Sequence, residues 1–400
     1  MSKKNYFTQA DIMLPKKNYE KWAVIACDQY TSEPEYWEDV KKIVGDEPSA
    51  LNIILPECYL SKDNSEYISK INRNMQSYLE GGVFSEYKDS FIYVERTQSD
   101  GVVRRGIVGK IDLEDYDYHP GTDKAIRATE QTVISRIPPR VEIRKDAPLE
   151  MPHVMLLIDD KDRSIIEALS DKAEQFEKIY DFTLMKSAGD IKGYRLDDKT
   201  AQNIKELLDK LADKNDGLLF CVGDGNHSLA TAKECYERDK NEYSRYALVE
   251  IVNIHDEALQ FEPIYRVVFG VDGEKLIDDF ISSAGGLYEG SDAHRYTCVL
   301  NGKQKQISVK PSAKLPVGTL QSFLDLYIKN IDGAEIDYIH GIDSTCKLCS
   351  AENTVGFIFD GMQKSELFPA VAADGSLPRK TFSMGHADDK RFYLEARKIK

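Results

Sequence analysis

A strand, a glycine-rich turn and a helix follow one another in residues 218–232, which read LLFCVGDGNHSLATA. The apolar run at 218–222 predicts a buried strand, and the apolar spacing within 229–236 predicts a helix. Residues 204–211 carry isoleucine and leucines at helical spacing just upstream. A helix, a strand, a turn and a second helix in this order are typical of an α/β layer.

The turn at residues 223–228 brings glycines, an aspartate, an amide, an imidazole and a hydroxyl to the start of the second helix. A helix N-terminus offers unpaired N–H groups and a positive dipole end, which together favour an anion such as phosphate. The same dipole disfavours a cation, so we expect the imidazole of His227 to be neutral. An ordinary turn capped by Asn226 or Ser228 is the alternative. We favour a functional turn, because an imidazole gains little structurally at that position.

Charge excludes one class of function. The 400 residues contain 53 basic and 68 acidic side chains, for a formal charge of −15. This balance argues against a nonspecific nucleic-acid binder, which usually carries a basic face. The first residues lack the apolar core of a signal peptide, and no stretch is long and apolar enough for a bilayer. We therefore expect a cytoplasmic protein without membrane contact, whose partner is a small phosphate-containing ligand; a homodimer is compatible with the sequence.

Seven cysteines at irregular spacing argue against a disulfide framework. Cys346 and Cys349 form a C-x-x-C pair, but a structural zinc site needs a second pair of ligands and none is evident. We interpret them as two incidental thiols and assign them no role, with a redox pair as the alternative.

The remaining patterns predict an α/β (α+β mixed) fold, with mixed sheets and flanking helices. We place one α/β domain at 1–270, which carries the turn, and a smaller α+β region at 271–400, whose C-terminal loop could return to the site. The patterns predict strands at 22–27, 51–55, 151–158 and 246–252, helices at 66–80 and 162–180, and a hairpin joining 91–96 to 102–111.

Two further segments carry groups that recognise anions. Arg140 closes a stretch at 123–140 that also contains two other arginines ahead of a proline pair. It is interpreted either as part of a phosphate or carboxylate clamp, since the guanidinium fork suits both anions, or as part of a solvated helix and loop. Near the C-terminus, residues 377–385 place Lys380 and Thr381 in a loop after a proline, where they could close over an anion.

Five segments in the same order resemble those of an uncharacterised bacterial and archaeal family, domain of unknown function family 1015. The family's Asp-Gly-His-His-Arg signature corresponds here to Asp-Gly-Asn-His-Ser, and the similarity extends over essentially the whole chain. The corresponding segments are Ala26–Tyr30, Thr129–Thr132, Phe261–Arg266, Asp224–Ser228 and Leu377–Thr381. Family histidines are replaced at Thr129, Asn226 and Tyr265, and the arginine of the signature is replaced by Ser228.

The turn alone also resembles the phosphate-binding turn of the ParB/sulfiredoxin-like superfamily, which includes free-serine kinases. This resemblance covers one turn and its flanks, and it implies a nucleotide phosphate on the backbone amides. Ser228 in place of arginine removes a bidentate phosphate contact, which is not a conservative change. Phosphate is then held by backbone, Asn226 and His227, or the ligand differs.

These observations lead to the hypothesis of a nucleotide-dependent phosphotransferase or phosphohydrolase acting on a small polar metabolite, with ATP or ADP and Mg²⁺ as cofactors. Asp224 would bind Mg²⁺ or accept a proton, His227 would be a phosphate ligand or general acid/base, and Glu130 or Asp28 would be the base for a substrate hydroxyl. The phosphate-binding set would be Gly223, Gly225, Asn226, Ser228, Arg140, Lys380 and Thr381.

Two alternatives belong to other classes. The missing histidines and arginine favour a sensor that binds a nucleotide or metabolite without turning it over. A ParB-like DNA-associated protein is less favoured, because the chain is acidic and lacks a basic helix-turn-helix segment.

Overall fold

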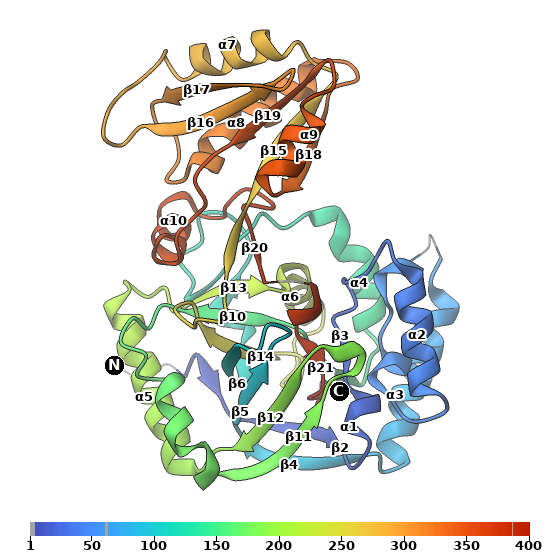
Figure 1. Cartoon of the computed structure of the whole chain (residues 1–400). Helices are drawn as coiled ribbons and strands as arrows, with labels where there is room; N and C mark the ends of the chain where they lie inside the picture. Colours follow the sequence, from blue (N-terminus) through green and yellow to red (C-terminus); the bar gives the residue numbers. More distant parts are fainter. Residues whose placement is uncertain (1–4, 61–62, 386) are drawn as a thin grey trace. The chain divides into compact units, whose positions relative to one another are not determined.

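The computed structural model describes residues 5–60, 63–385 and 387–400 (Figure 1). These residues divide into two compact units. Of the described residues, the first unit comprises 5–60, 63–128, 132–259, 385 and 387–400, and the second comprises 129–131 and 260–384. The chain therefore leaves the first unit after residue 259 and returns to it for its last residues, which we call the C-terminal strap (residues 387–400).

A large mixed sheet forms the centre of the first unit. Its strands are β1 (Phe7–Thr8), β5 (Ile92–Thr97), β6 (Val103–Asp112), β7 (Tyr116–Asp117), β8 (Ile126–Ala128), β10 (Met155–Ile158), β11 (Glu177–Thr183), β12 (Asp190–Arg195), β13 (Phe220–Asp224) and β14 (Tyr246–Asn253). Within the described residues they form ten strands in the order β11-β12-β5-β6-β14-β10-β13-β8-β7, with β1 beside β6. The pairs β10–β14, β8–β13 and β7–β8 are parallel, whereas β13 runs antiparallel to β10.

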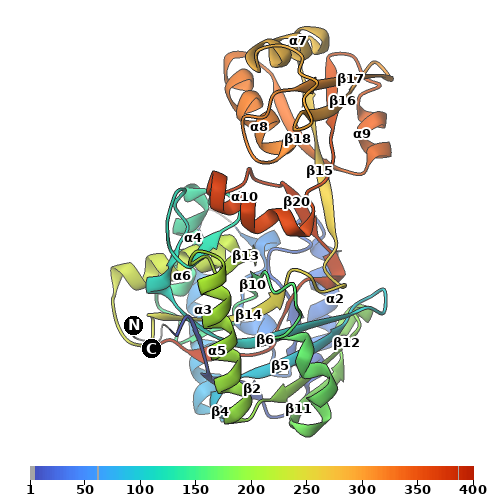
Figure 2. The ribbon, with the colours of Figure 1, turned by 90° about the vertical axis from the view of Figure 1, so that its left-hand side faces the viewer.

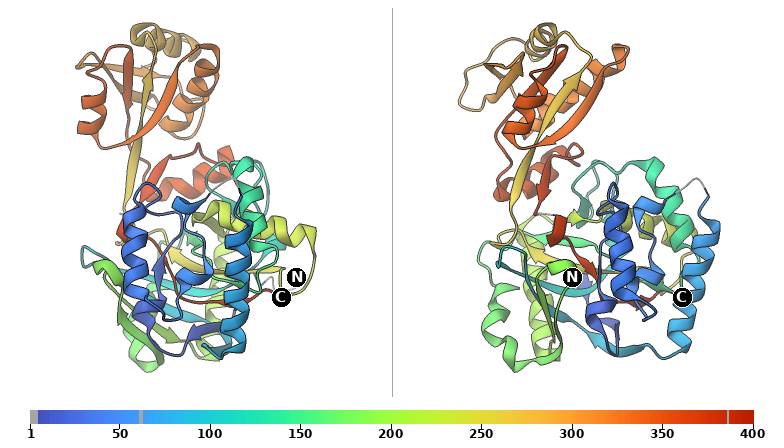
Figure 3. Two further views of the ribbon diagram at one scale, coloured as in Figure 1. Left: turned by 90° about the vertical axis from the view of Figure 1, so that its right-hand side faces the viewer. Right: turned by 45° about the vertical axis from the view of Figure 1, so that its right-hand side comes forward.

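Helices cover both faces of this sheet. They are α1 (Tyr19–Trp22), α2 (Pro34–Val44), α3 (Ser65–Glu80), α4 (Ile137–Arg144), α5 (Asp198–Lys214) and α6 (Asn226–Arg238). Figure 2 shows α5 in front of the sheet, and the left view of Figure 3 shows α2 and α3 on the other side. Side chains alternate along a strand, so Tyr93 and Ile107 join the core beneath α5 and α6, while Val94 and Val108 join the core beneath α2 and α3.

Three short antiparallel pairs complete the first unit, and two of them involve the C-terminal strap. The pairs are β2 (Ala10–Pro15) with β4 (Phe84–Ser90), β3 (Val24–Ile25) with β21 (Phe392–Tyr393), and β9 (Leu149–Glu150) with β22 (Arg397–Lys398). The strap is thus hydrogen-bonded to segments that lie far away in the sequence, and Ala396 also exchanges two backbone hydrogen bonds with Met13 of β2.

The second unit is a separate α+β body. Its strands are β15 (Phe261–Phe269), β16 (His294–Leu300), β17 (Lys303–Val309), β18 (Glu335–His340), β19 (Thr354–Ile358) and β20 (Phe382–Met384), and its helices are α7 (Gly273–Ser283), α8 (Pro316–Tyr327), α9 (Ile342–Leu348) and α10 (Leu367–Asp374). The described strands form one six-stranded sheet, ordered β17-β16-β19-β15-β18 with β20 beside β15. Cys349, just after α9, packs in the core against Val267 and Val299.

The mixed α/β class with flanking helices is confirmed, but two predicted elements are wrong. Residues 50–53 form a 3₁₀ helix, not a strand, and the Ser49 side chain caps it by accepting a hydrogen bond from the N–H of Leu51. The predicted helix at 162–180 is instead a 3₁₀ helix at Glu167–Gln175 followed by the edge strand β11. No helix in the described residues is long and apolar enough to cross a membrane.

Candidate functional site

The turn between β13 and α6 is built by a glycine. Gly225 is the N-cap of α6 and adopts a left-handed conformation (φ 82°), with no side chain capping the helix. A Cβ at this position would lie 3.0 Å from the Cα of Val154, so both the backbone angle and the available space require glycine. The alternative of a turn capped by Asn226 or Ser228 is therefore wrong. Among the described residues, no group accepts a hydrogen bond from the amides of His227 and Ser228.

Asp224 ends β13 and turns its carboxylate toward this N-terminus. Its Oδ1 accepts a hydrogen bond from the N–H of Gly225 at 2.8 Å, and its Oδ2 lies 3.1 Å from Nζ of Lys390. Burial by itself would raise the pKa of Asp224, but Lys390, His153 and the Gly225 amide outweigh it and hold this pKa below its usual value. Asp224 is therefore an ionised carboxylate with a cation as its partner.

His153 and Asp28 join this cluster from two other segments. His153, just before β10, is buried; its Nε2 lies 3.9 Å from Oδ2 of Asp28 and its Nδ1 lies 2.8 Å from the hydroxyl of Tyr393. The Tyr393 hydroxyl also donates to Sγ of Cys27 at 3.0 Å. Burial raises the pKa of the Cys27 thiol to about 12, so this cysteine is not a thiolate. Asp28 remains partly exposed, with its side chain 33% accessible.

His227 follows on the first turn of α6. Its Nε2 accepts a hydrogen bond from the N–H of Val133 at 3.2 Å, which leaves the proton on Nδ1. Burial lowers the pKa of His227 to about 4, and the charges of Arg140 and Arg136 act in the same direction. The imidazole is neutral at pH 7, and burial is the largest cause of its lowered pKa.

This depressed pKa predicts a specific acid sensitivity. The unfolded chain binds a proton at His227 near pH 6.5, whereas the folded protein binds it only near pH 4, so stability is present above pH 6.5 and is lost as the pH falls. We expect this residue to cost about 2 kcal/mol between roughly pH 7 and pH 5. Urea unfolding at both pH values should show the loss reduced by this amount in His227→Gln. The exposed His340→Gln should leave it unchanged; equal losses in wild type and His227→Gln would contradict the assignment.

Arg140 is already paired. It lies on α4, which packs against α6, and its guanidinium forms an ion pair with Glu57 and donates to the carbonyl of Arg136 at 3.0 Å. The stretch at 123–140 is not one long solvated helix. It comprises β8, a 3₁₀ turn at Ile134–Arg136 and the start of α4. A ligand anion would have to compete with Glu57 for this guanidinium.

Glu130, Lys380 and Thr381 belong to the second unit, where they form their own cluster. The N–H of Lys380 donates to Oε1 of Glu130 at 3.1 Å, and Thr381 donates to the carbonyl of Pro378 at 2.7 Å. The fully buried Arg266 holds the loop, because its guanidinium donates to the carbonyls of Lys380 and Arg379 at 2.9 and 3.1 Å. Sequence reasoning did not identify Arg266 as the organiser of this loop.

His153, Tyr393 and Lys390 are the members of the Asp224 cluster that sequence reasoning missed. No periodicity or motif marks them: His153 is a lone histidine before a strand, and Lys390 lies in a charged run near the C-terminus. Such a run is usually interpreted as a solvated surface. Only their contacts identify them: His153 with Asp28, Lys390 with Asp224, and Tyr393 with His153.

Comparison with known proteins gives one family and several distant structures. A model of the family described as Protein of unknown function (DUF1015) matches residues 9–327. No curated protein matches the chain. Among solved structures, the chain is similar to a free serine kinase in complex with AMP, with 11% identity, a TM-score of 0.41 and coverage of 72% of this chain and 91% of that one.

Two further structures lie at a similar distance. A conserved hypothetical protein from Pyrococcus furiosus is 12% identical, with a TM-score of 0.37 and coverage of 71% of this chain and 92% of that one. SbnI with C-terminal truncation from Staphylococcus aureus is 11% identical, with a TM-score of 0.37 and coverage of 70% and 82%.

Proposed function

The chain belongs to the family described as Protein of unknown function (DUF1015), and we propose that this member binds a nucleotide phosphate at the Asp224 turn and transfers it to a small polar metabolite. The observation that carries the proposal is the left-handed Gly225 N-cap, which exposes the first amides of α6 beside an ionised Asp224 and a neutral His227. Amides, a carboxylate and a neutral imidazole at one point suit a phosphate with its metal ion.

In this proposal the residues of the turn bind different parts of the ligand. The amides of His227 and Ser228 would hold phosphate oxygens, and Nδ1–H of His227 would donate to another, because Nε2 is engaged by Val133. Asp224 suits Mg²⁺, which commonly takes one or two protein carboxylates and completes its shell with phosphate oxygens and water. The described residues contain no cluster of three or more ligating side chains, so the nucleotide would supply part of the shell.

Asp28 is the proposed base for the acceptor. Its partly exposed carboxylate would take the proton of a substrate hydroxyl while the hydroxyl oxygen forms a bond to the γ-phosphorus. The bond from that phosphorus to the bridging oxygen would break, and ADP would leave. His153 would orient the carboxylate from 3.9 Å. With water as the acceptor the same step is hydrolysis. Glu130, Lys380 and Thr381 remain candidates from the sequence alone.

A binding protein without turnover is the second candidate. Two cations near the turn, Arg140 and Lys390, already have carboxylate partners, and Ser228 stands where the family carries an arginine. A site whose charges are internally balanced can bind a nucleotide while lacking the free cation that phosphoryl transfer uses.

A ligand screen with two matched glycine variants tests phosphate binding. Wild-type protein is heated with ATP, ADP, pyrophosphate or phosphate, each with and without Mg²⁺. We expect a higher Tm with at least one of them, since a ligand that binds the folded state stabilises it. Gly225→Ala and Gly217→Ala both place alanine at positive φ (82° and 86°), but only Gly225 shapes the turn. Gly217→Ala should cost about 1 kcal/mol, because its added Cβ meets nothing within 4 Å. Gly225→Ala should cost more, because its Cβ also lies 3.0 Å from the Cα of Val154, and only this variant should lose the ligand response.

The outcomes separate the candidates. No Tm shift with any phosphate, or an equal shift in both variants, would sink phosphate binding at this turn. If binding is found, ³¹P spectra of ATP with small alcohols such as serine identify the reaction. A phosphate ester with ADP supports transfer, free phosphate with ADP supports hydrolysis, and unchanged ATP supports the binding protein.

A further inference from the structure

The C-terminal strap delivers one side chain to the Asp224 turn. Lys390 reaches back so that its Nζ lies 3.1 Å from Oδ2 of Asp224, although 166 positions separate the two residues. The Lys390 side chain as a whole is 21% exposed. Both residues belong to the first unit, and the strap is anchored there by β21 and β22.

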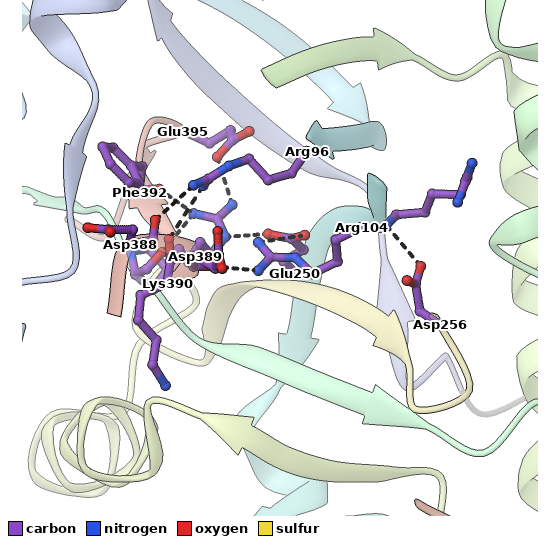
Figure 4. A network of polar contacts seen from close by, with 12 residues as sticks. Arg96, Arg104, Glu250, Asp256, Asp388, Asp389, Lys390, Phe392 and Glu395 are labelled. Carbon is purple, nitrogen blue, oxygen red and sulfur yellow. Dashed lines mark hydrogen bonds and ion pairs between the residues drawn. The ribbon is translucent and has the colours of Figure 1, made fainter. Parts of the chain in front are cut away.

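Two buried arginines donate hydrogen bonds to the backbone carbonyls around Lys390. The guanidinium of Arg96 donates to the carbonyls of Asp388 and Lys390 at 3.1 and 3.4 Å, and that of Arg104 donates to the carbonyl of Asp389 at 3.0 Å. Three successive carbonyls are thereby held from one side. Figure 4 shows the Lys390 side chain pointing away from these arginines. Arg96 therefore holds the backbone carbonyl of Lys390, while the ammonium at the other end of the side chain lies beside Asp224.

Holding the strap with Arg96 and Arg104 carries a free-energy cost, because both guanidinium groups are buried. Arg96 and Arg104 are 1% and 4% exposed, and burying a guanidinium is unfavourable unless it finds strong partners. Burial lowers the pKa of Arg96 to about 9, with repulsion from Arg104 adding to it. Besides the strand pairs β3–β21 and β9–β22, the two arginines fix the backbone position of residues 388–390.

We propose that Lys390 is a phosphate-binding residue of the Asp224 site and that Arg96 and Arg104 position it. This rests on the function proposed above. In the free protein the ammonium neutralises Asp224. With a phosphate and Mg²⁺ bound, Asp224 would be the residue that holds the metal and Lys390 would contact a phosphate oxygen, so every charge would keep a partner. The sequence suggested Lys380 for this role; Lys390 is the lysine that contacts Asp224.

Metal-free pyrophosphate separates Lys390 from the metal role of Asp224. Isothermal titration is done in EDTA on wild type, Asp224→Asn, Lys390→Met and the double variant. Asp224→Asn removes a repelling carboxylate and releases Lys390, so we expect pyrophosphate to bind roughly tenfold more tightly than to wild type. The double variant should lose that gain, and it leaves no unpaired charge at the ion pair. Lys390→Arg should restore part of the binding that Lys390→Met loses.

The results distinguish this inference from the function on which it rests. A gain in Asp224→Asn that persists in the double variant would overturn the role of Lys390 and leave phosphate binding intact. If neither wild type nor Asp224→Asn binds pyrophosphate, with or without Mg²⁺, the proposed function fails as well. Circular dichroism and Tm establish that each variant is folded.

A pair of equally conservative changes tests the positioning role. Arg96→Lys keeps the charge but replaces the fork that spans two carbonyls with a single ammonium. Arg397→Lys makes the same change at a buried arginine of the strap that contacts Glu150 and the carbonyls of Tyr243 and Tyr246 instead. We expect Arg96→Lys to weaken pyrophosphate binding by roughly fivefold to tenfold and Arg397→Lys to leave it unchanged. Equal affinity in the two variants would refute positioning by Arg96.

Discussion

Replacing Arg391 with methionine is expected to lower the free energy of unfolding by about 3 to 5 kcal/mol. The guanidinium of Arg391 donates to Oε2 of Glu250 and to Oε2 of Glu395, both at 2.7 Å. Both glutamates are buried, at 2% and 1% exposure, so the variant would leave two carboxylates in the core without this partner. Urea unfolding at pH 7 measures the loss.

The pH dependence of this loss identifies its cause. Burial acts to raise the pKa of Glu250, but Arg104 and Arg391 reverse this and hold the pKa below its usual value. Without Arg391 the Glu250 carboxylate takes up a proton more readily, so the deficit of the variant should shrink as the pH falls toward 5. Lys398→Met, at an exposed position of the same strap, should change stability by less than about 1 kcal/mol. A deficit that does not change with pH would speak against orphaned carboxylates.

Asp224→Asn is expected to weaken Mg²⁺-dependent ATP binding by about a hundredfold, or about 2.7 kcal/mol. The amide is nearly the same size and can still accept the hydrogen bond from Gly225, but it is a poor ligand for Mg²⁺. Titration of ATP in excess Mg²⁺ measures the change. Its direction is opposite to the gain expected with metal-free pyrophosphate, a combination that simple damage to the turn would not produce.

Asp159→Asn is the matched control. Asp159 follows the last residue of β10 and lies 2.6 Å from Nε2 of His255. Asp224 instead pairs in register with Met155, the first residue of β10, so the two aspartates lie at opposite ends of that strand. Asp159→Asn should leave ATP affinity within about twofold of wild type. Equal losses in the two variants would mean that the effect is not specific to the turn.

The local elements around the site could be predicted because their signals lie within a few residues. The helical spacing before residue 214, the apolar run into β13 and the glycines of the turn all correspond to observed elements. The hairpin β5–β6 was found in the same way from its alternation and turn. Elements with weak local signals were missed. β11 is an edge strand of mostly polar residues, and the short apolar run at 51–55 fits a 3₁₀ turn as well as a strand.

The strand, the turn and the helix start could thus be predicted from the chain, because the signals for them lie in neighbouring residues. The surroundings of that turn depend on residues that are remote from it. Asp28, His153 and Lys390 come from three distant segments. Local composition favoured Arg140 and Lys380 instead, but Arg140 is paired with Glu57 and Lys380 belongs to the second unit. Contacts of this kind give no periodic pattern in the sequence, because they depend on burial and charge pairing between residues that only the folded chain brings together.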